Sequence, residues 1–129
     1  MFKSIASLAL TVVLGIGASN SAMAQSMAQS KGYLRVLVVS TEDVPRYVHE
    51  LDSGKRILQR LGVSVQTRVW RATFAGPEAG SIVVTQQFDS FAAFADAAKR
   101  TAADAEYSQW IMSLDKIRKI ASDSLYQEL

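Results

Sequence analysis

The side chains best suited to binding chemistry in this chain are the neighbouring aromatic and cationic residues Trp70, Arg71 and Phe74. An aromatic ring beside a guanidinium can hold a flat acid by stacking and charge pairing. The same aromatics can instead pack in an interface between two copies of the chain, with Arg71 reaching solvent or a partner carboxylate. The sequence favours this packing interpretation.

Three further side chains complete the set of candidate ligand-binding residues. His49 is the only histidine, and it lies one step off the apolar stripe of its expected helix, which predicts a partly exposed side chain rather than a haem ligand or general base. Tyr107 and Trp110 lie at helical spacing, where inward aromatics usually belong to the core. The speculative ligand-binding set is Trp70, Arg71, Phe74, His49, Tyr107 and Trp110, and no residue is predicted to be catalytic.

Motifs that carry metal or nucleophile chemistry are lacking in the sequence. It contains no HExxH, GxSxG or P-loop pattern, and without cysteine it has no thiolate ligand, cysteine nucleophile or disulfide. Acidic residues at 42–43 and at 104 and 106 are explained as helix starts. We therefore expect no metal and no cofactor, and the sequence leans against an enzyme without excluding one.

The first residues have the pattern of a secretory signal peptide. Lys3 provides a positive start, residues 5–17 are apolar but short for a bilayer span, and Ala22-Met23-Ala24 has the small-x-small spacing of a cleavage site. A retained anchor is the alternative, but the polar residues 19–21 argue against it. No twin arginine is present. The sequence predicts Sec export of residues 25–129 to the periplasm or the medium, with no membrane attachment after cleavage.

Residues 25–32 are predicted to be a flexible leader, and residues 33–129 fit one small domain. The net charge of +2 gives no electrostatic argument for nucleic-acid binding. Lys55, Arg56 and Arg60 do cluster, but acidic residues precede them, which is typical of a solvated helix face.

The first half of this domain predicts a strand and then a helix. Residues 33–40 are rich in β-branched and large apolar side chains, typical of a central strand. A helix then begins at Asp43 as cap, tolerates Pro45 in its first turn and ends at Gly62. Gly54 in its middle indicates either a bend or a close packing contact. The predicted apolar stripe comprises Val44, Tyr47, Val48, Leu51, Leu58 and Leu61.

A hairpin is predicted next. Residues 63–69 alternate as in a half-buried strand, and the alternation changes phase at Trp70, which predicts a bulge or strong twist there. Residues 75–80 contain two glycines and a proline and are predicted to be the loop. Residues 81–88 form the returning strand.

The last part predicts a helix in two pieces. Asp89 or Ser90 caps the first piece, residues 101–104 interrupt it, and a second piece runs from 105 to about 117. Residues 122–129 fit either a fourth strand or a short helix. The predicted inward side chains are Phe91, Phe94, Ala95, Ala98 and Ala102 in the first piece and Tyr107, Trp110, Ile111 and Leu114 in the second.

This order of elements predicts an α+β, ferredoxin-like βαββαβ domain, an antiparallel sheet with helices on one face. The opposite face then needs a cover, and a second copy of the chain would provide one through an isologous interface. We therefore expect a homodimer through the open sheet face.

From Tyr33 onward the chain resembles the dimeric α/β-barrel superfamily. The segments GSIVVTQQFDSFAAFADAAKR and EYSQW are similar to NIPSNAP-like members and related small domains of unknown function, with Phe88, Phe91, Trp110 and Leu114 as the main anchors. The resemblance implies a ferredoxin-like protomer, a dimer and a pocket between sheet and helices. The superfamily hosts several chemistries, so it implies no single reaction.

Two function classes remain at this point. The favoured one is an exported, non-catalytic module, acting as a dimer or binding a small apolar or aromatic molecule. The alternative is a cofactor-independent monooxygenase-like enzyme acting on a phenolic or quinone-type substrate. Asparagine is a common participant in that group, and residues 25–129 contain none.

Overall fold

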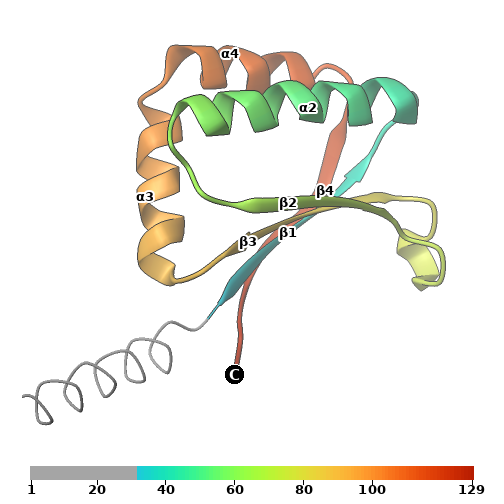
Figure 1. Ribbon diagram of the computed structural model, residues 1–129. Coiled ribbons are helices and arrows are strands. Elements are labelled where there is room, and N and C mark those ends of the chain that lie inside the picture. The colour runs from blue at the N-terminus through green and yellow to red at the C-terminus, as the bar shows by residue number, and fades with distance from the viewer. Residues whose placement is uncertain (1–31) are drawn as a thin grey trace, which may run out of the picture. The chain divides into compact units, whose positions relative to one another are not determined.

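Four strands and three helices make up residues 32–129, the part of the chain that this computed structural model describes (Figure 1). The predicted signal peptide and nearly all of the predicted leader lie outside the described residues. The strands are β1 (Tyr33–Ser40), β2 (Gln66–Arg71), β3 (Ile82–Phe88) and β4 (Lys119–Gln127). The helices are α2 (Val44–Arg60), α3 (Phe91–Ala102) and α4 (Ala105–Leu114), with a short 3-10 turn, η1 (Gly76–Glu78), in the hairpin loop.

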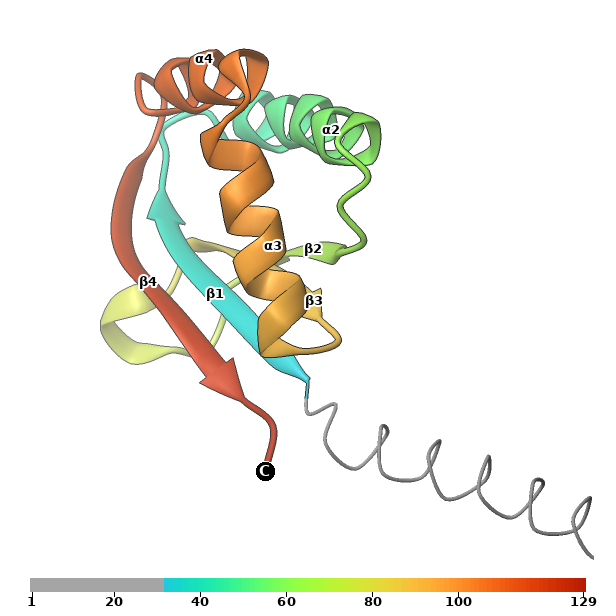
Figure 2. The ribbon, with the colours of Figure 1, turned by 90° about the vertical axis from the view of Figure 1, so that its left-hand side faces the viewer.

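The four strands form one antiparallel sheet in the order β2-β3-β1-β4. All three helices lie on one face of this sheet, with α2 and α4 side by side and α3 running along the sheet (Figures 1 and 2). The predicted ferredoxin-like α+β fold is confirmed, as is the central position of β1. None of the helices in residues 32–129 has the length and apolar character needed to cross a membrane.

Helix α2 begins and ends where the sequence predicts. The Asp43 carboxylate accepts a hydrogen bond from the Arg46 backbone N–H at 3.1 Å, and Gly62 just past the end has a positive φ of 72°. The predicted stripe is partly wrong, because the Val48 side chain is 38% exposed whereas Ile57 is buried. Val48 lies beyond the edge of the buried stripe that its neighbours on the helix form: Tyr47, Leu51, Gly54, Ile57 and Leu58.

Gly54 is a packing contact and not a helix bend, because α2 continues without interruption across it. The Trp110 indole of α4 lies directly against Gly54, where a Cβ atom would overlap its ring atoms Cη2 and Cζ2. The Trp110 Nε1–H also donates to the Glu50 carbonyl at 3.0 Å. Because Gly54 has no side chain, the Trp110 indole can lie against α2 at this position, and α4 packs closely on α2.

The predicted bulge at Trp70 is wrong. Strand β2 pairs with β3 in unbroken register from Gln66 to Arg71. The bulge of this sheet lies instead in β4, where Ala121 is the extra residue between the pairs Val38–Ser122 and Val39–Ile120. Both faces of β2 carry apolar side chains, with Val69 toward the helices and Trp70 on the opposite face, and this two-sided pattern resembles a change of phase in the sequence.

The helix in two pieces is confirmed. Of the two predicted caps it is Ser90 that accepts from the Ala93 N–H, and the Asp104 carboxylate caps α4 by accepting from the Tyr107 N–H at 2.9 Å. The tail is a strand, β4, paired with β1. In α3 the buried residue is Ala97. Four of the predicted inward positions are therefore wrong, because these residues are exposed: Phe91, Ala95, Ala98 and Ala102.

Candidate functional site

A cavity lies between the three helices and the face of the sheet that they cover. Its inner chamber has a volume of about 80 Å³ and adjoins an outer groove of about 650 Å³. The two share lining residues from the sheet, from α2 and from α4, among them Arg35, Tyr107 and Arg118. The combined space is of the size that holds a small organic molecule.

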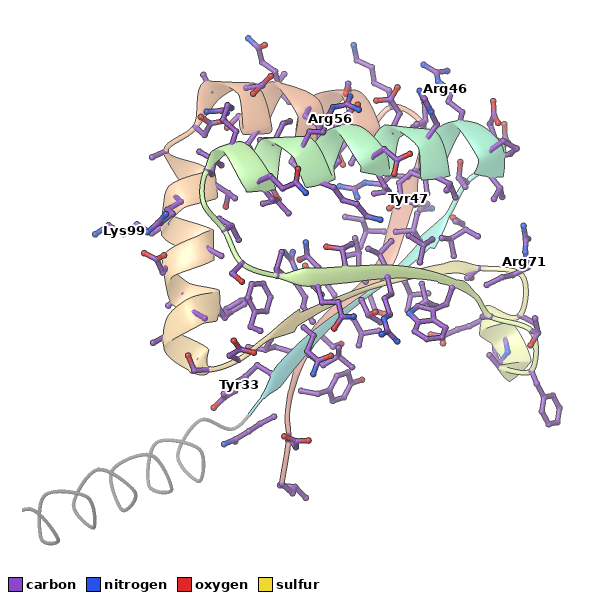
Figure 3. The ribbon with its side chains drawn as sticks, viewed as in Figure 1. Tyr33, Arg46, Tyr47, Arg56, Arg71 and Lys99 are labelled. Carbon is purple, nitrogen blue, oxygen red and sulfur yellow. The ribbon has the colours of Figure 1, made fainter. Side chains whose placement is uncertain are left out.

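Alternation along the strands decides which side chains line the cavity. On β1 the odd-numbered residues face the helices, so Arg35 and Leu37 point into the space while Leu34 and Val36 lie on the opposite face. Arg35 pairs in register with Gln86 of β3, which therefore points into the same space. The Tyr47 side chain descends from α2 toward the sheet, whereas Arg46 and Arg56 point away (Figure 3).

An ion pair spans two strands in the groove. The Arg35 guanidinium donates to both carboxylate oxygens of Asp123 on β4, from Nε at 2.9 Å and from Nη2 at 2.6 Å. This hydrogen-bonded guanidinium lowers the pKa of Asp123 below its usual range, and the carboxylate in turn raises the pKa of Arg35. The bidentate geometry fixes the orientation of Arg35.

Because folding lowers the pKa of Asp123, this carboxylate stabilises the fold above its unfolded pKa of about 4 and ceases to do so as the pH falls through its folded value. We expect the melting temperature of the natural protein to fall more steeply with acidification below pH 4 than that of Asp123→Asn. At pH 7 the substitution costs about 1 kcal/mol or less, because the pair is partly exposed. Asp52→Asn, at an exposed position on α2, is the control, and an equal pH slope in Asp123→Asn and the natural protein would contradict the prediction.

A second guanidinium, that of Arg118, lies between α4 and β4 and is almost wholly buried, with its side chain 5% exposed. Its contacts are long: Nη1 lies 3.3 Å from the Tyr47 hydroxyl, and Nε and Nη2 lie 3.3 and 3.2 Å from one oxygen of Asp115. The Asp115 side chain is mostly exposed to solvent. Arg118 is thus a buried cation with weak partners.

Tyr107 of α4 contributes a phenol to the space between sheet and helices. Burial raises the pKa of Tyr107, so its hydroxyl stays protonated at neutral pH and can donate a hydrogen bond. Its ring lies 5.5 Å from that of Trp110, and the two rings form an aromatic wall. Residues 32–129 hold no group of three or more acidic or histidine side chains that could bind a metal ion.

The structure separates the predicted site residues into two groups. Tyr107 and Trp110 line the cavity. Trp70 and Arg71 are not neighbours in space, because they point to opposite faces of the sheet. Trp70 lies on the open face with its Nε1–H on the Thr85 hydroxyl at 2.9 Å, and Arg71 lies at the hairpin end of the sheet, away from the cavity (Figure 3). Neither residue lines the inner chamber or the outer groove.

The two remaining predicted residues also lie away from this space. Phe74 is fully exposed in the hairpin loop, and His49 is exposed on α2. The cluster of Trp70, Arg71 and Phe74 expected from sequence therefore does not form within one protomer.

The sequence analysis did not identify four polar residues of the cavity: Arg35, Gln86, Arg118 and Asp123. Arg35 carried a usable signal, because a charged side chain inside a central apolar strand needs a buried partner or a ligand. Arg118 follows a helix and precedes a strand without a motif, so its burial arises from tertiary packing alone.

Neither a family model nor a curated protein sequence matches this chain. Solved structures do, with 7–13% identity. A NIPSNAP family protein from Agrobacterium tumefaciens has a TM-score of 0.58 at 13% identity, covering 77% of this chain and 83% of its own. A mutant of SnoaB, a cofactor-independent oxygenase from Streptomyces nogalater, has a TM-score of 0.56 at 11% identity, covering 75% and 91%.

A third similar structure is a conserved protein of unknown function from Bacteroides thetaiotaomicron, described as a possible oxidoreductase. Its TM-score is 0.53 at 7% identity, covering 77% of this chain and 98% of its own. Such low identities show a shared fold and nothing about chemistry. The expected resemblance to NIPSNAP-like, ferredoxin-like domains is confirmed at the level of the fold.

Proposed function

We propose that this chain is an exported, homodimeric module that binds a small apolar or aromatic molecule between its helices and its sheet, without catalysing a reaction. The cavity supports this proposal most directly. Its walls are mainly apolar side chains from three strands and from all three helices, with a few polar groups converging on one region. Such a composition is typical of small-molecule sites.

We do not extend the monooxygenase-like activity to this chain. The similarity to SnoaB, at 11% identity, concerns the fold. Asparagine, the residue commonly associated with that chemistry, is lacking in residues 25–129. The two carboxylates that border the outer groove, Asp115 and Asp123, are each paired with an arginine.

The dimer part of the proposal rests on the open face of the sheet. This face carries a row of apolar and aromatic side chains from all four strands, among them Trp70, which is 49% exposed. A protomer that exposes such a patch usually buries it against a partner. The side chains of this open face that a second copy would cover include Leu34, Val36, Val83, Trp70 and Tyr126.

The export part rests on Lys3, the apolar residues 5–17 and the Ala22-Met23-Ala24 site. Sequencing the N-terminus of protein recovered outside the cytoplasm tests it. A mature chain starting at Gln25 is expected, and a chain that retains Met1 would contradict cleavage.

Filling the groove should abolish ligand binding. Ala98 lines the outer groove from α3 and is exposed, so Ala98→Phe should fold while its ring occupies the ligand space. A thermal-shift screen with phenols, quinones, naphthalenes and haem identifies the ligand class. At a concentration about 100-fold above Kd, binding adds about 2.7 kcal/mol and raises Tm by roughly 10 °C.

The matched control is Ala92→Phe, which adds the same ring to α3 at an exposed position that lines neither chamber nor groove. It should keep the full Tm shift, whereas Ala98→Phe should lose it. A flat response of the natural protein to every probe would count against small-molecule binding. An equal shift in both variants would show that the ligand does not occupy the outer groove.

A further inference from the structure

We propose that the molecule bound in this cavity is a small aromatic anion, with its carboxylate or equivalent acidic oxygens on the guanidinium of Arg118 and its ring in the inner chamber. This inference rests on the proposed binding function and specifies the chemical class of its ligand. Its support comes from the distribution of charge around the cavity and from the unsatisfied donors of one buried cation.

The inner chamber is lined by cations without carboxylates. Among the side chains that border it, Arg35, Lys55 and Arg118 are positively charged, and none is Asp or Glu. The two carboxylates near the site, Asp115 and Asp123, border the outer groove alone. Asp123 offsets most of the charge of Arg35, whereas Asp115 approaches Arg118 through a single oxygen of a mostly exposed side chain. The positive charge available to a ligand in the chamber therefore lies mainly at Arg118, which favours an anion there.

Among the cations of the chamber, Arg118 is the one whose protein partners leave N–H donors unused. A guanidinium carries five N–H groups, and the three contacts of Arg118 are each 3.2 Å or longer, two of them to a single oxygen of a mostly exposed carboxylate. Nη1 and Nη2 each retain a second N–H. Because burying a charge without close partners is costly, a ligand oxygen pair on these donors would satisfy a need that the protein leaves open.

Arg35 has a different role, because both of its contacts to Asp123 are short and bidentate. Its charge is largely offset by that carboxylate, and its bidentate N–H donors are already bound to it. Tyr107 adds a neutral hydroxyl donor beside it. The acidic group of the ligand is thus expected at Arg118, with Tyr107 as a second donor.

The rest of the chamber suits an aromatic ring. Apolar side chains from the sheet, from α2 and from α4 form its walls, including Leu37, Val84, Leu51 and Ile111, and the indole of Trp110 closes one side. Ring stacking against Trp110 and Tyr107 would then hold the body of the ligand while the guanidinium holds its acid.

Two probes of similar size test this assignment, naphthoate and naphthalenemethanol, which share a ring system and of which only naphthoate carries a negative charge. Titration calorimetry on the full mature chain should give a Kd for naphthoate about ten- to hundredfold lower than for the alcohol, the range expected when a hydrogen bond to a charged group is gained. The comparison needs no variant.

Substitutions then test whether Arg118 is the residue that causes the preference for naphthoate. Arg118→Gln should bring the two Kd values within about twofold of each other, because the buried cation is gone. Arg46→Gln removes an equivalent charge from the outer side of α2, where Arg46 points away from the cavity, and should leave the preference intact (Figure 3). If Arg118→Gln does not fold, Arg118→Lys should weaken naphthoate binding about tenfold while sparing the alcohol, since an ammonium lacks the bidentate fork.

The outcomes of this experiment distinguish a failure of the anion assignment from a failure of the proposed binding function. Equal affinity for both probes in the natural protein would overturn the anion assignment and leave the binding function standing. Binding of neither probe would overturn both. A preference for naphthoate that persists undiminished in Arg118→Gln, or in Arg118→Lys where that variant is needed, would reject Arg118 as the anchor.

Discussion

Gly54→Ala is expected to destabilise the protein by about 1–3 kcal/mol, although alanine is the better helix former. A Cβ at position 54 would overlap Cη2 and Cζ2 of Trp110 and lie 3.0 Å from Cε2. Overpacking of this kind costs about 1–3 kcal/mol. A shifted indole would also lose its hydrogen bond to the Glu50 carbonyl, and both losses oppose the gain of about 1 kcal/mol in helix propensity.

The sign of the effect should reverse when the ring is removed. In a Trp110→Ala background the added methyl group meets no indole, so Gly54→Ala should stabilise the protein by up to about 1 kcal/mol. A double-mutant cycle measured by urea unfolding therefore gives a coupling free energy of several kcal/mol between positions 54 and 110.

A cavity left by Trp110→Ala will lower the absolute stability, and the cycle removes that contribution because it appears in both arms. Destabilisation by Gly54→Ala of equal size in both backgrounds would show that its cost does not come from the Trp110 contact. Stabilisation in the natural background would show that α4 docks loosely on α2.

Much of the fold was predictable from local patterns. Capping residues and breaks lie where Asp43, Gly62, Ser90 and Asp104 indicate, because these signals act through the backbone groups nearest to them. The phase change at Trp70 led to a wrong prediction, because apolar side chains on both faces of β2 give the same sequence pattern as a shift in register. The helices cover one face of the whole sheet, and the sequence of a single strand does not show which face that is.

The candidate site was less predictable, because its polar residues come from four separate segments. Arg35, Gln86, Arg118 and Asp123 meet through strand register and the path of the chain after α4, and no short motif encodes that meeting. Trp70 and Arg71 looked like a pair because they are adjacent in sequence, yet adjacent residues in a strand point to opposite faces. Adjacent positions in a strand are therefore evidence against two side chains lining the same binding site.

The same rule gives the second large prediction, that Val36→Glu converts the proposed dimer to a monomer. Val36 lies on β1 near the middle of the open face, opposite Thr85 of β3 and Ser124 of β4. In an isolated protomer a glutamate there can be solvated. In an isologous dimer it would be buried twice, at a cost of about 3 kcal/mol or more per uncompensated charge, so Kd for dimerisation should rise at least a hundredfold.

Light scattering at micromolar concentration measures the effect, with circular dichroism to show that the variant stays folded. Met112→Glu is the matched control, since Met112 is 66% exposed on α4, on the helical side of the sheet, and its replacement should leave the dimer intact. A monomeric mass for the natural protein would reject the dimer itself. A dimer that survives Val36→Glu would mean that the two copies meet through another surface, and the apolar open face would then need a different partner.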